Sequence, residues 1–299
     1  MTYGGPELRG DLPGGPLTPP TADRGSRILA PLKAEGGKGV LIAVVSTVVF
    51  FAVVIVAVLN SSGWPEIKRA FFNGDIFAGS LPKIVEAFRR NVFIFVAAEI
   101  LVLTWALILA VLRSLTGPVF FPLRLLATGY VDLFRAVPTI LVILLLGFGA
   151  PALRLQGIPR SDTFWAVIAL TLVYSAYVAE VYRAGIESVH PSQVASARAL
   201  GLSRRKTLRF VVIPQAVRRV IPPLLNDFIG LQKDSALVVV LGGVVEGLRQ
   251  AQVIVAATFN FTPYVALALV YVVITIPQAR FVDWLVARDR RRRQAAGGV

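Results

Sequence analysis

Residues 40–59 read VLIAVVSTVVFFAVVIVAVL and contain no charged side chain. A helix needs about 20 predominantly apolar residues to cross about 30 Å of hydrocarbon, so this stretch predicts a transmembrane helix. The whole chain agrees, because 56% of its 299 residues are hydrophobic, 16% are charged, and the mean hydropathy is +0.70. A soluble domain is about 45–50% apolar and about 25% charged. The sequence therefore predicts an all-α integral membrane protein.

Five further stretches are apolar enough, or long enough, to cross a membrane. The third runs across Pro138, which predicts a kinked helix. The fifth is amphipathic. We expect about six transmembrane helices in total, at residues 40–59, 92–112, 130–151, 164–182, 222–245 and 264–286.

The charges outside these spans predict the orientation, because Lys and Arg gather in cytoplasmic loops. With the amino terminus inside, the inner segments hold 22 of the 31 Lys and Arg, and the outer loops hold 8. We therefore expect both termini in the cytoplasm. Residues 1–39 are rich in Gly and Pro and predict a disordered tail. Residues 287–299 predict a basic cytoplasmic tail in contact with anionic membrane lipid.

The cysteine and histidine content excludes several kinds of site. Without cysteine the chain has no disulfide, thiolate nucleophile or iron–sulfur cluster. One histidine, His190, excludes the usual multi-histidine metal sites. The run Gly36-Gly37-Lys38 is not a phosphate-binding loop, because it lacks the leading glycine and the following Ser or Thr. We expect no catalytic residue, no metal and no cofactor on this chain.

The loop between the fourth and fifth spans carries the most information. Residues 184–220 read AGIESVHPSQVASARALGLSRRKTLRFVVIPQAVRRV. Ser192 can cap a short helix ending near Ala199, and Gly201 suits the left-handed residue after such a helix. Ser203 can cap a second helix, which Pro214 would interrupt. The pattern predicts two basic helices joined by a tight glycine turn.

This pattern has two interpretations. Its turn spacing and the net charge of +14 are compatible with a DNA-binding helix-turn-helix. It also resembles the coupling loop of ABC importer membrane subunits. The sequence pattern of that loop is EAA, then three residues, Gly, nine residues and I-x-L-P. The matching residues are Ala195, Ser196, Ala197, Gly201, Val211, Ile213 and Pro214. Ala195 departs from the glutamate usual in that family. A recognition helix tied to membrane spans at both ends lacks freedom to enter a groove, so we favour the coupling loop and expect no nucleic acid partner.

Three more segments, 130–151, 174–185 and 218–242, resemble the permeases of polar amino acid ABC importers. The resemblance covers about residues 81–286 and implies a five-span permease core, with residues 40–60 forming an extra amino-terminal span. It implies that the chain is the membrane-spanning subunit of an importer in the bacterial plasma membrane, and not an enzyme. The implied partners are an ATP-binding cassette ATPase that holds ATP and Mg, an extracytoplasmic solute-binding protein, and a second permease subunit, identical or related.

The interpretation as an importer subunit has two alternatives. One is an ATP-independent channel or secondary carrier, and the other is a membrane-tethered regulator. A secondary carrier would need no basic coupling loop, and inverted repeats would be typical of it. The sequence shows no such internal repeat.

Polar residues inside the spans are candidates for a substrate path, because a charge at a helix centre costs about 2.5–3.5 kcal/mol. Each also has a structural interpretation. Glu180 can pair with Arg183, and Lys233 can neutralise a neighbouring acid. The candidate path residues are Glu99, Glu180, Asn226, Lys233 and Asp234.

Overall fold

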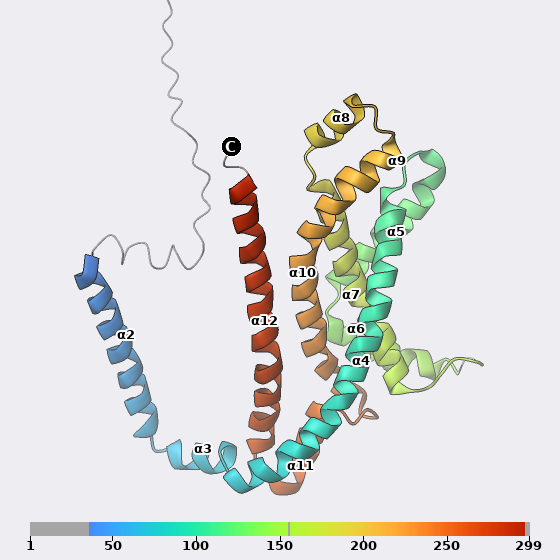
Figure 1. The fold of residues 1–299 in the computed structure, drawn as a ribbon. Coiled ribbons are helices and arrows are strands. Elements are labelled where there is room, and N and C mark those ends of the chain that lie inside the picture. Colours follow the sequence, from blue (N-terminus) through green and yellow to red (C-terminus); the bar gives the residue numbers. More distant parts are fainter. Residues whose placement is uncertain (1–35, 155, 297–299) are drawn as a thin grey trace, which may run out of the picture. The chain divides into compact units, whose positions relative to one another are not determined.

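A computed structural model of the chain describes residues 36–154 and 156–296, which contain helices and no strand. The chain divides into two compact units, Met1–Pro65 and Glu66–Val299, each described by itself. The elements, labelled in Figure 1, are α2 (Gly36–Leu59), α3 (Trp64–Phe71), α4 (Gly74–Ser114), η1 (Pro118–Phe120), α5 (Phe121–Ala136), α6 (Thr139–Ala152), α7 (Asp162–Glu187), α8 (Pro191–Ala199), α9 (Arg204–Thr207), η2 (Leu208–Val212), α10 (Ile213–Asp234), η3 (Ser235–Leu241), α11 (Gly247–Thr258) and α12 (Thr262–Ala296).

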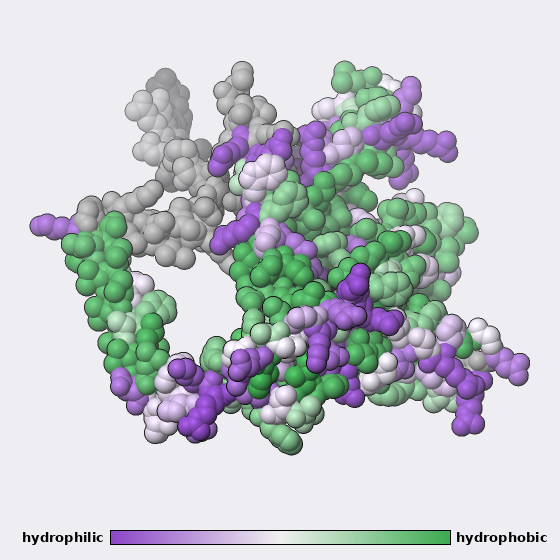
Figure 2. All heavy atoms as spheres, turned by 60° about the horizontal axis from the view of Figure 1, so that its bottom comes forward, coloured by the Kyte–Doolittle hydropathy of each residue, from purple (hydrophilic) through white to green (hydrophobic). Residues whose placement is uncertain are grey.

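The helix of the first unit, α2, covers the stretch predicted as an extra amino-terminal span and is long and apolar enough to cross a membrane. Figure 2 shows α2 as a column of almost uniformly hydrophobic side chains, and none of its apolar stretch is buried inside the protein. A helix that is hydrophobic all round is typical of a membrane span. It begins at Gly36, so the last four residues of the expected tail are helical. The rest of that tail, residues 1–35, lies outside the described residues.

Fewer helices than the predicted six are apolar enough to be counted as spans. Within the described residues four stretches qualify: α2, α3 with α4, α7 and α12. α5 and α6 make a fifth if the pair, bent by 105°, is one span. The bend follows Val137, whose extended backbone precedes Pro138, as proline requires. α10 does not qualify, because it is amphipathic and carries several basic and acidic residues.

The second predicted span starts much earlier than residue 92. α4 begins at Gly74, where the Asn73 side chain accepts a hydrogen bond from the Ile76 backbone N–H at 3.0 Å. The first half of α4 falls between the first two predicted spans, in a segment expected to be an outer loop. Its Ile84 and Phe88 are buried against α11 and α12, and this packing stabilises an amphipathic helix.

α7 is the central helix of the second unit. It packs against α4, α5, α6 and α10, and its small residues allow close approach. α7 and α10 approach each other closely at Gly185, where an added Cβ would lie 2.0 Å from Val220 Cγ2.

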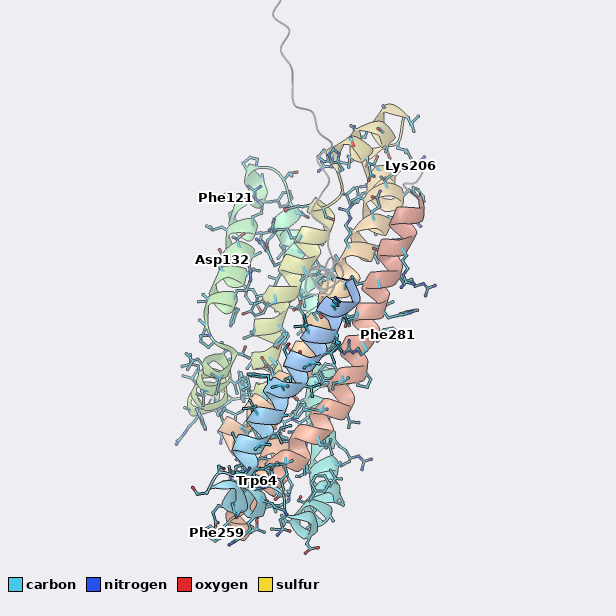
Figure 3. All side chains as sticks on the ribbon, turned by 90° about the vertical axis from the view of Figure 1, so that its left-hand side faces the viewer. Trp64, Phe121, Asp132, Lys206, Phe259 and Phe281 are labelled. Atoms are coloured by element: carbon cyan, nitrogen blue, oxygen red, sulfur yellow. The ribbon has the colours of Figure 1, made fainter. Side chains whose placement is uncertain are left out.

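The second unit has two distinct ends. α8, α9 and the carboxyl end of α12 lie at one end, and α11 with the start of α4 lies at the other (Figure 1). In Figure 3, Lys206 and Phe121 mark the first end and Phe259 the second. α12 continues to Ala296, so residues 287–296 of the predicted tail are helical, and residues 297–299 lie outside the described residues.

Candidate functional site

The predicted pair of short helices is present as α8 and α9, which we call the hairpin. The expectation that Ser192 caps the first helix is wrong. His190 is the cap, and its Nδ1 accepts a hydrogen bond from the Ser192 N–H at 3.2 Å. The reason is Pro191, whose fixed φ and missing N–H suit the first helical position, so that the cap must precede it.

The turn of the hairpin is the predicted glycine turn. Gly201 has φ +84°, a left-handed conformation that favours glycine. Its N–H donates to the Arg198 carbonyl at 3.0 Å, and the Leu202 N–H donates to the Ala197 carbonyl at 3.2 Å. This pair of bonds is the Schellman motif, which ends helices. Ser203 caps α9 as predicted, by accepting from the Lys206 N–H at 3.4 Å.

Pro214 does not interrupt the second helix, contrary to expectation. α9 passes through the π-helical segment η2, which contains Val211, directly into α10, which begins at Ile213. A π-helical turn accommodates a break in the usual hydrogen-bond pattern, and proline is tolerated in the first turn of a helix. The hairpin is therefore joined to α10 without a loop.

The tip of the hairpin presents an apolar side chain to its surroundings. Leu200 is 84% exposed, and Ala195 and Ser196 are exposed beside it, whereas Ala197 is buried. Ala197 instead holds the hairpin together from inside.

An ion-pair cluster lies at the end of α7 that leads into the hairpin. Glu180 pairs with Arg183, as the sequence predicts, and also with Arg113 of α4 at 2.9 Å. Arg183 pairs in addition with Glu187. The Arg113–Glu180 pair ties α4 to α7, and the other two pairs lie within α7. A contact of Glu180 with substrate stays a prediction.

A second feature is a set of polar residues on α10 and α12, two helices that pack together, and we call this set the polar seam. Five of its buried side-chain atoms have no hydrogen-bond partner within the described residues. They belong to Asp227, Gln232, Tyr271, Thr275 and Gln278. The last three are spaced four and three residues apart and so share one face of α12. An unpaired buried polar group costs about 1–3 kcal/mol, so the seam is suited to polar groups from outside the chain.

Glu99 of α4 lies near one member of the seam, Asp227. It is half-buried and lies within electrostatic range of Asp227. One turn earlier, Phe95 packs edge-on against Phe228 with ring centroids 4.6 Å apart, which holds α4 against α10 at this level. The structure therefore brings together two carboxyl groups that are far apart in sequence.

The other candidate path residues are not gathered into one site. Asn226 and Lys233 are exposed on α10. The partner of Asp234 is the Tyr174 hydroxyl, which donates to Oδ2 at 2.9 Å, and no ion pair joins Asp234 to Lys233 within the described residues. α10 ends at Asp234, and the 3-10 helix η3 that follows packs Leu237 against the core.

One buried network escaped sequence analysis. Glu246 caps α11 by accepting from the Leu248 and Arg249 N–H groups at 2.8 Å. Asn91 of α4 donates to Glu246 at 3.0 Å and accepts from the Gly247 N–H at 2.9 Å. Burial raises the pKa of Glu246, and these donors oppose the rise. No local pattern reveals the network, because Asn91 and Glu246 are 155 residues apart.

The family of binding-protein-dependent transport system inner membrane components matches residues 114–291, which include the hairpin and the polar seam. The chain belongs to this family. A probable glutamine ABC transporter permease of Bacillus subtilis is 38% identical over 173 residues, covering 57% of this chain and 77% of the relative. A probable amino-acid permease of the same organism is 32% identical over 219 residues, covering 73% and 92%.

Solved structures agree with this assignment. The crystal structure of an amino acid ABC transporter with histidines has a chain that matches with a TM-score of 0.63 at 31% identity, covering 69% of this chain and 94% of the other. The chain is therefore a multi-pass amino-acid ABC transporter permease. Because the family match includes residues 184–220, it favours the coupling-loop interpretation over the DNA-binding one.

Proposed function

We propose that the permease is the membrane-spanning subunit of an importer in the bacterial plasma membrane that translocates a polar amino acid and is driven by a separate ATPase subunit. The observation that carries the proposal is the hairpin, which retains the coupling-loop spacing and projects from the bundle with an exposed Leu200. Relatives named for glutamine, arginine and glutamate/aspartate transport support the substrate class.

In this mechanism ATP and Mg bind to the partner ATPase, and the resulting movement of the ATPase displaces the hairpin. The hairpin passes into α10 without a loop, so a displacement of α9 moves α10, and α10 carries one side of the polar seam. The ion pair of Glu180 with Arg113 holds α4 against α7, and these two helices form the frame against which α10 moves. The ATPase must bind the two conformations of the permease with different free energies, since otherwise ATP could not change the equilibrium between them.

The substrate would pass along the polar seam. Glu99 and Asp227 place two carboxyl groups near each other, and a cationic group between them would relieve their repulsion. The ammonium group of an amino acid supplies that charge. Asn226 and Lys233, exposed on α10, would face the second permease subunit across the pore, and the solute-binding protein would dock at the α11 end.

We expect Gly201→Pro to abolish coupling. Proline cannot adopt the positive φ of Gly201, and it lacks the N–H that donates to Arg198. Tagged wild-type permease purified from native membranes should retain an ATP-binding subunit, and the variant should lose it together with at least 90% of amino acid uptake.

The matched control is Gly157→Pro, which strains another glycine of positive φ, +80°, away from the hairpin. The control variant should retain the ATP-binding subunit on purification. If wild-type permease takes up amino acids without any ATPase, the proposal is wrong and an ATP-independent channel or carrier is correct.

We expect Glu99→Gln and Asp227→Asn each to reduce uptake of labelled glutamine, arginine or glutamate, whichever the wild type transports, by about 10- to 100-fold, because each removes one carboxylate from the seam. Glu86→Gln removes an exposed carboxylate from the same helix and should leave uptake unchanged. Normal uptake with both seam variants would remove Glu99 and Asp227 from the substrate path.

A further inference from the structure

An apolar groove of about 770 Å³ lies between α4 and α10 at the hairpin end of the second unit. It is separate from the polar seam, since none of the seam's unpaired residues lines it. α4 forms one wall, α10 the other, α7 contributes between them, and α8 and α9 close one end. Its apolar lining includes Leu107, Val111, Ile186, Val217 and Ile221, all of which are exposed.

The hairpin end of the groove is positively charged. Arg198 of α8 and Arg204 of α9 both line it, and no acidic residue does. Both arginines are exposed and form no ion pair within the described residues. Nearby Arg113 and Arg183 are held by carboxylates. The groove therefore offers two free guanidinium groups at one end of an otherwise apolar surface.

The groove lies at the level where the candidate spans end. Its α4 and α7 walls are the last turns of two candidate spans, which end at Ser114 and Glu187. The two arginines belong to the hairpin, beyond these span ends. Along the groove an apolar surface thus changes into a basic one where hydrocarbon gives way to headgroups.

We propose that the groove binds an anionic phospholipid, with an acyl chain between α4 and α10 and the phosphate on Arg198 and Arg204. Guanidinium groups bind phosphate oxygens through paired, charge-assisted hydrogen bonds. A headgroup with a net negative charge is favoured there, whereas a choline headgroup adds a positive charge beside the arginines. The bound lipid would join the hairpin to α4 and α10. This site does not depend on which solute the permease carries.

Native mass spectrometry of the purified full chain in mild detergent tests the proposal, with phosphatidylglycerol and phosphatidylcholine added in equal amounts. The wild type should retain phosphatidylglycerol at least tenfold better. The double variant Arg198→Ala with Arg204→Ala should lose this preference. The control, Arg205→Ala with Arg209→Ala, removes the same charge from neighbouring exposed positions that do not line the groove, and should keep it.

Two further variants separate the groove from a diffuse surface charge. Val111→Trp and Val217→Trp fill the groove from opposite walls and leave the arginines intact, so each should lower lipid retention. Glycerophosphoglycerol, the headgroup without acyl chains, should not displace the lipid. Displacement by this headgroup would show a free phosphate site instead.

The proposal is overturned if the wild type shows no preference, or if the control variant loses as much as the groove variant. It is also overturned if the groove is a contact between two copies. The chain has no cysteine, so Val111→Cys and Val217→Cys can be introduced singly. Efficient cross-linking between copies at these positions, with lipid preference unaffected by Arg198→Ala and Arg204→Ala, would identify a second copy as the occupant.

Discussion

Gly185→Ala is expected to destabilise the permease strongly, lowering the free energy of unfolding by about 1–3 kcal/mol. The new Cβ would lie 2.0 Å from Val220 Cγ2 and 3.4 Å from the Ala216 carbonyl oxygen, inside the crossing of α7 and α10. Val220 is 7% exposed and has little room to move. The Tm of the purified protein in detergent measures the effect, and a fall of several degrees is expected.

Two comparisons make this prediction specific. Gly129→Ala adds the same methyl group to a helical glycine of α5 with no atom within 4 Å, and should leave Tm unchanged or slightly raised. Val220→Ala removes the clashing methyl groups, so the double variant Gly185→Ala with Val220→Ala should recover most of the loss. An unchanged Tm for Gly185→Ala alone would contradict the close crossing.

Glu246→Ala is expected to have an effect at least as large, about 3 kcal/mol. Glu246 is fully buried, and the substitution removes the acceptor of the Leu248 and Arg249 N–H groups. It also leaves the Asn91 amide with only its bond to the Ser235 hydroxyl, 3.2 Å away. Each unsatisfied buried donor costs about 1–3 kcal/mol, and loss of a helix cap alone costs about 1 kcal/mol. Tm in detergent again measures the loss, and Glu246→Gln, which keeps one acceptor oxygen, should lose less.

A double-mutant cycle with Asn91→Ala tests whether the two residues act as a unit. Because they hydrogen-bond directly, the double variant should be less destabilised than the sum of the singles, by about 0.5–3 kcal/mol. Glu66→Ala is the control, since its pairing with Arg69 is exposed and contributes about 0–1 kcal/mol. Strict additivity of Asn91→Ala and Glu246→Ala would show that the network has no joint role.

Features set by a few neighbouring residues were predictable. The glycine turn at Gly201 and the cap at Ser203 follow from local backbone preferences. The ion pair of Glu180 and Arg183 follows from their spacing on one helix. Local reasoning failed where a competing local effect was overlooked. Pro191 moved the cap to His190, and Pro214 lies in the first turn of α10, where proline is tolerated.

The sequence by itself determined the class of the protein, its apolar helices and the hairpin, because hydropathy and turn geometry depend on residues close together in the chain. The tertiary structure alone decided the extent of α4, the pairing of Asn91 with Glu246, the approach of Glu99 to Asp227, and the groove beneath the hairpin. These features join residues far apart in the chain. These features are stabilised by packing and buried hydrogen bonds, which exist only once the helices have assembled.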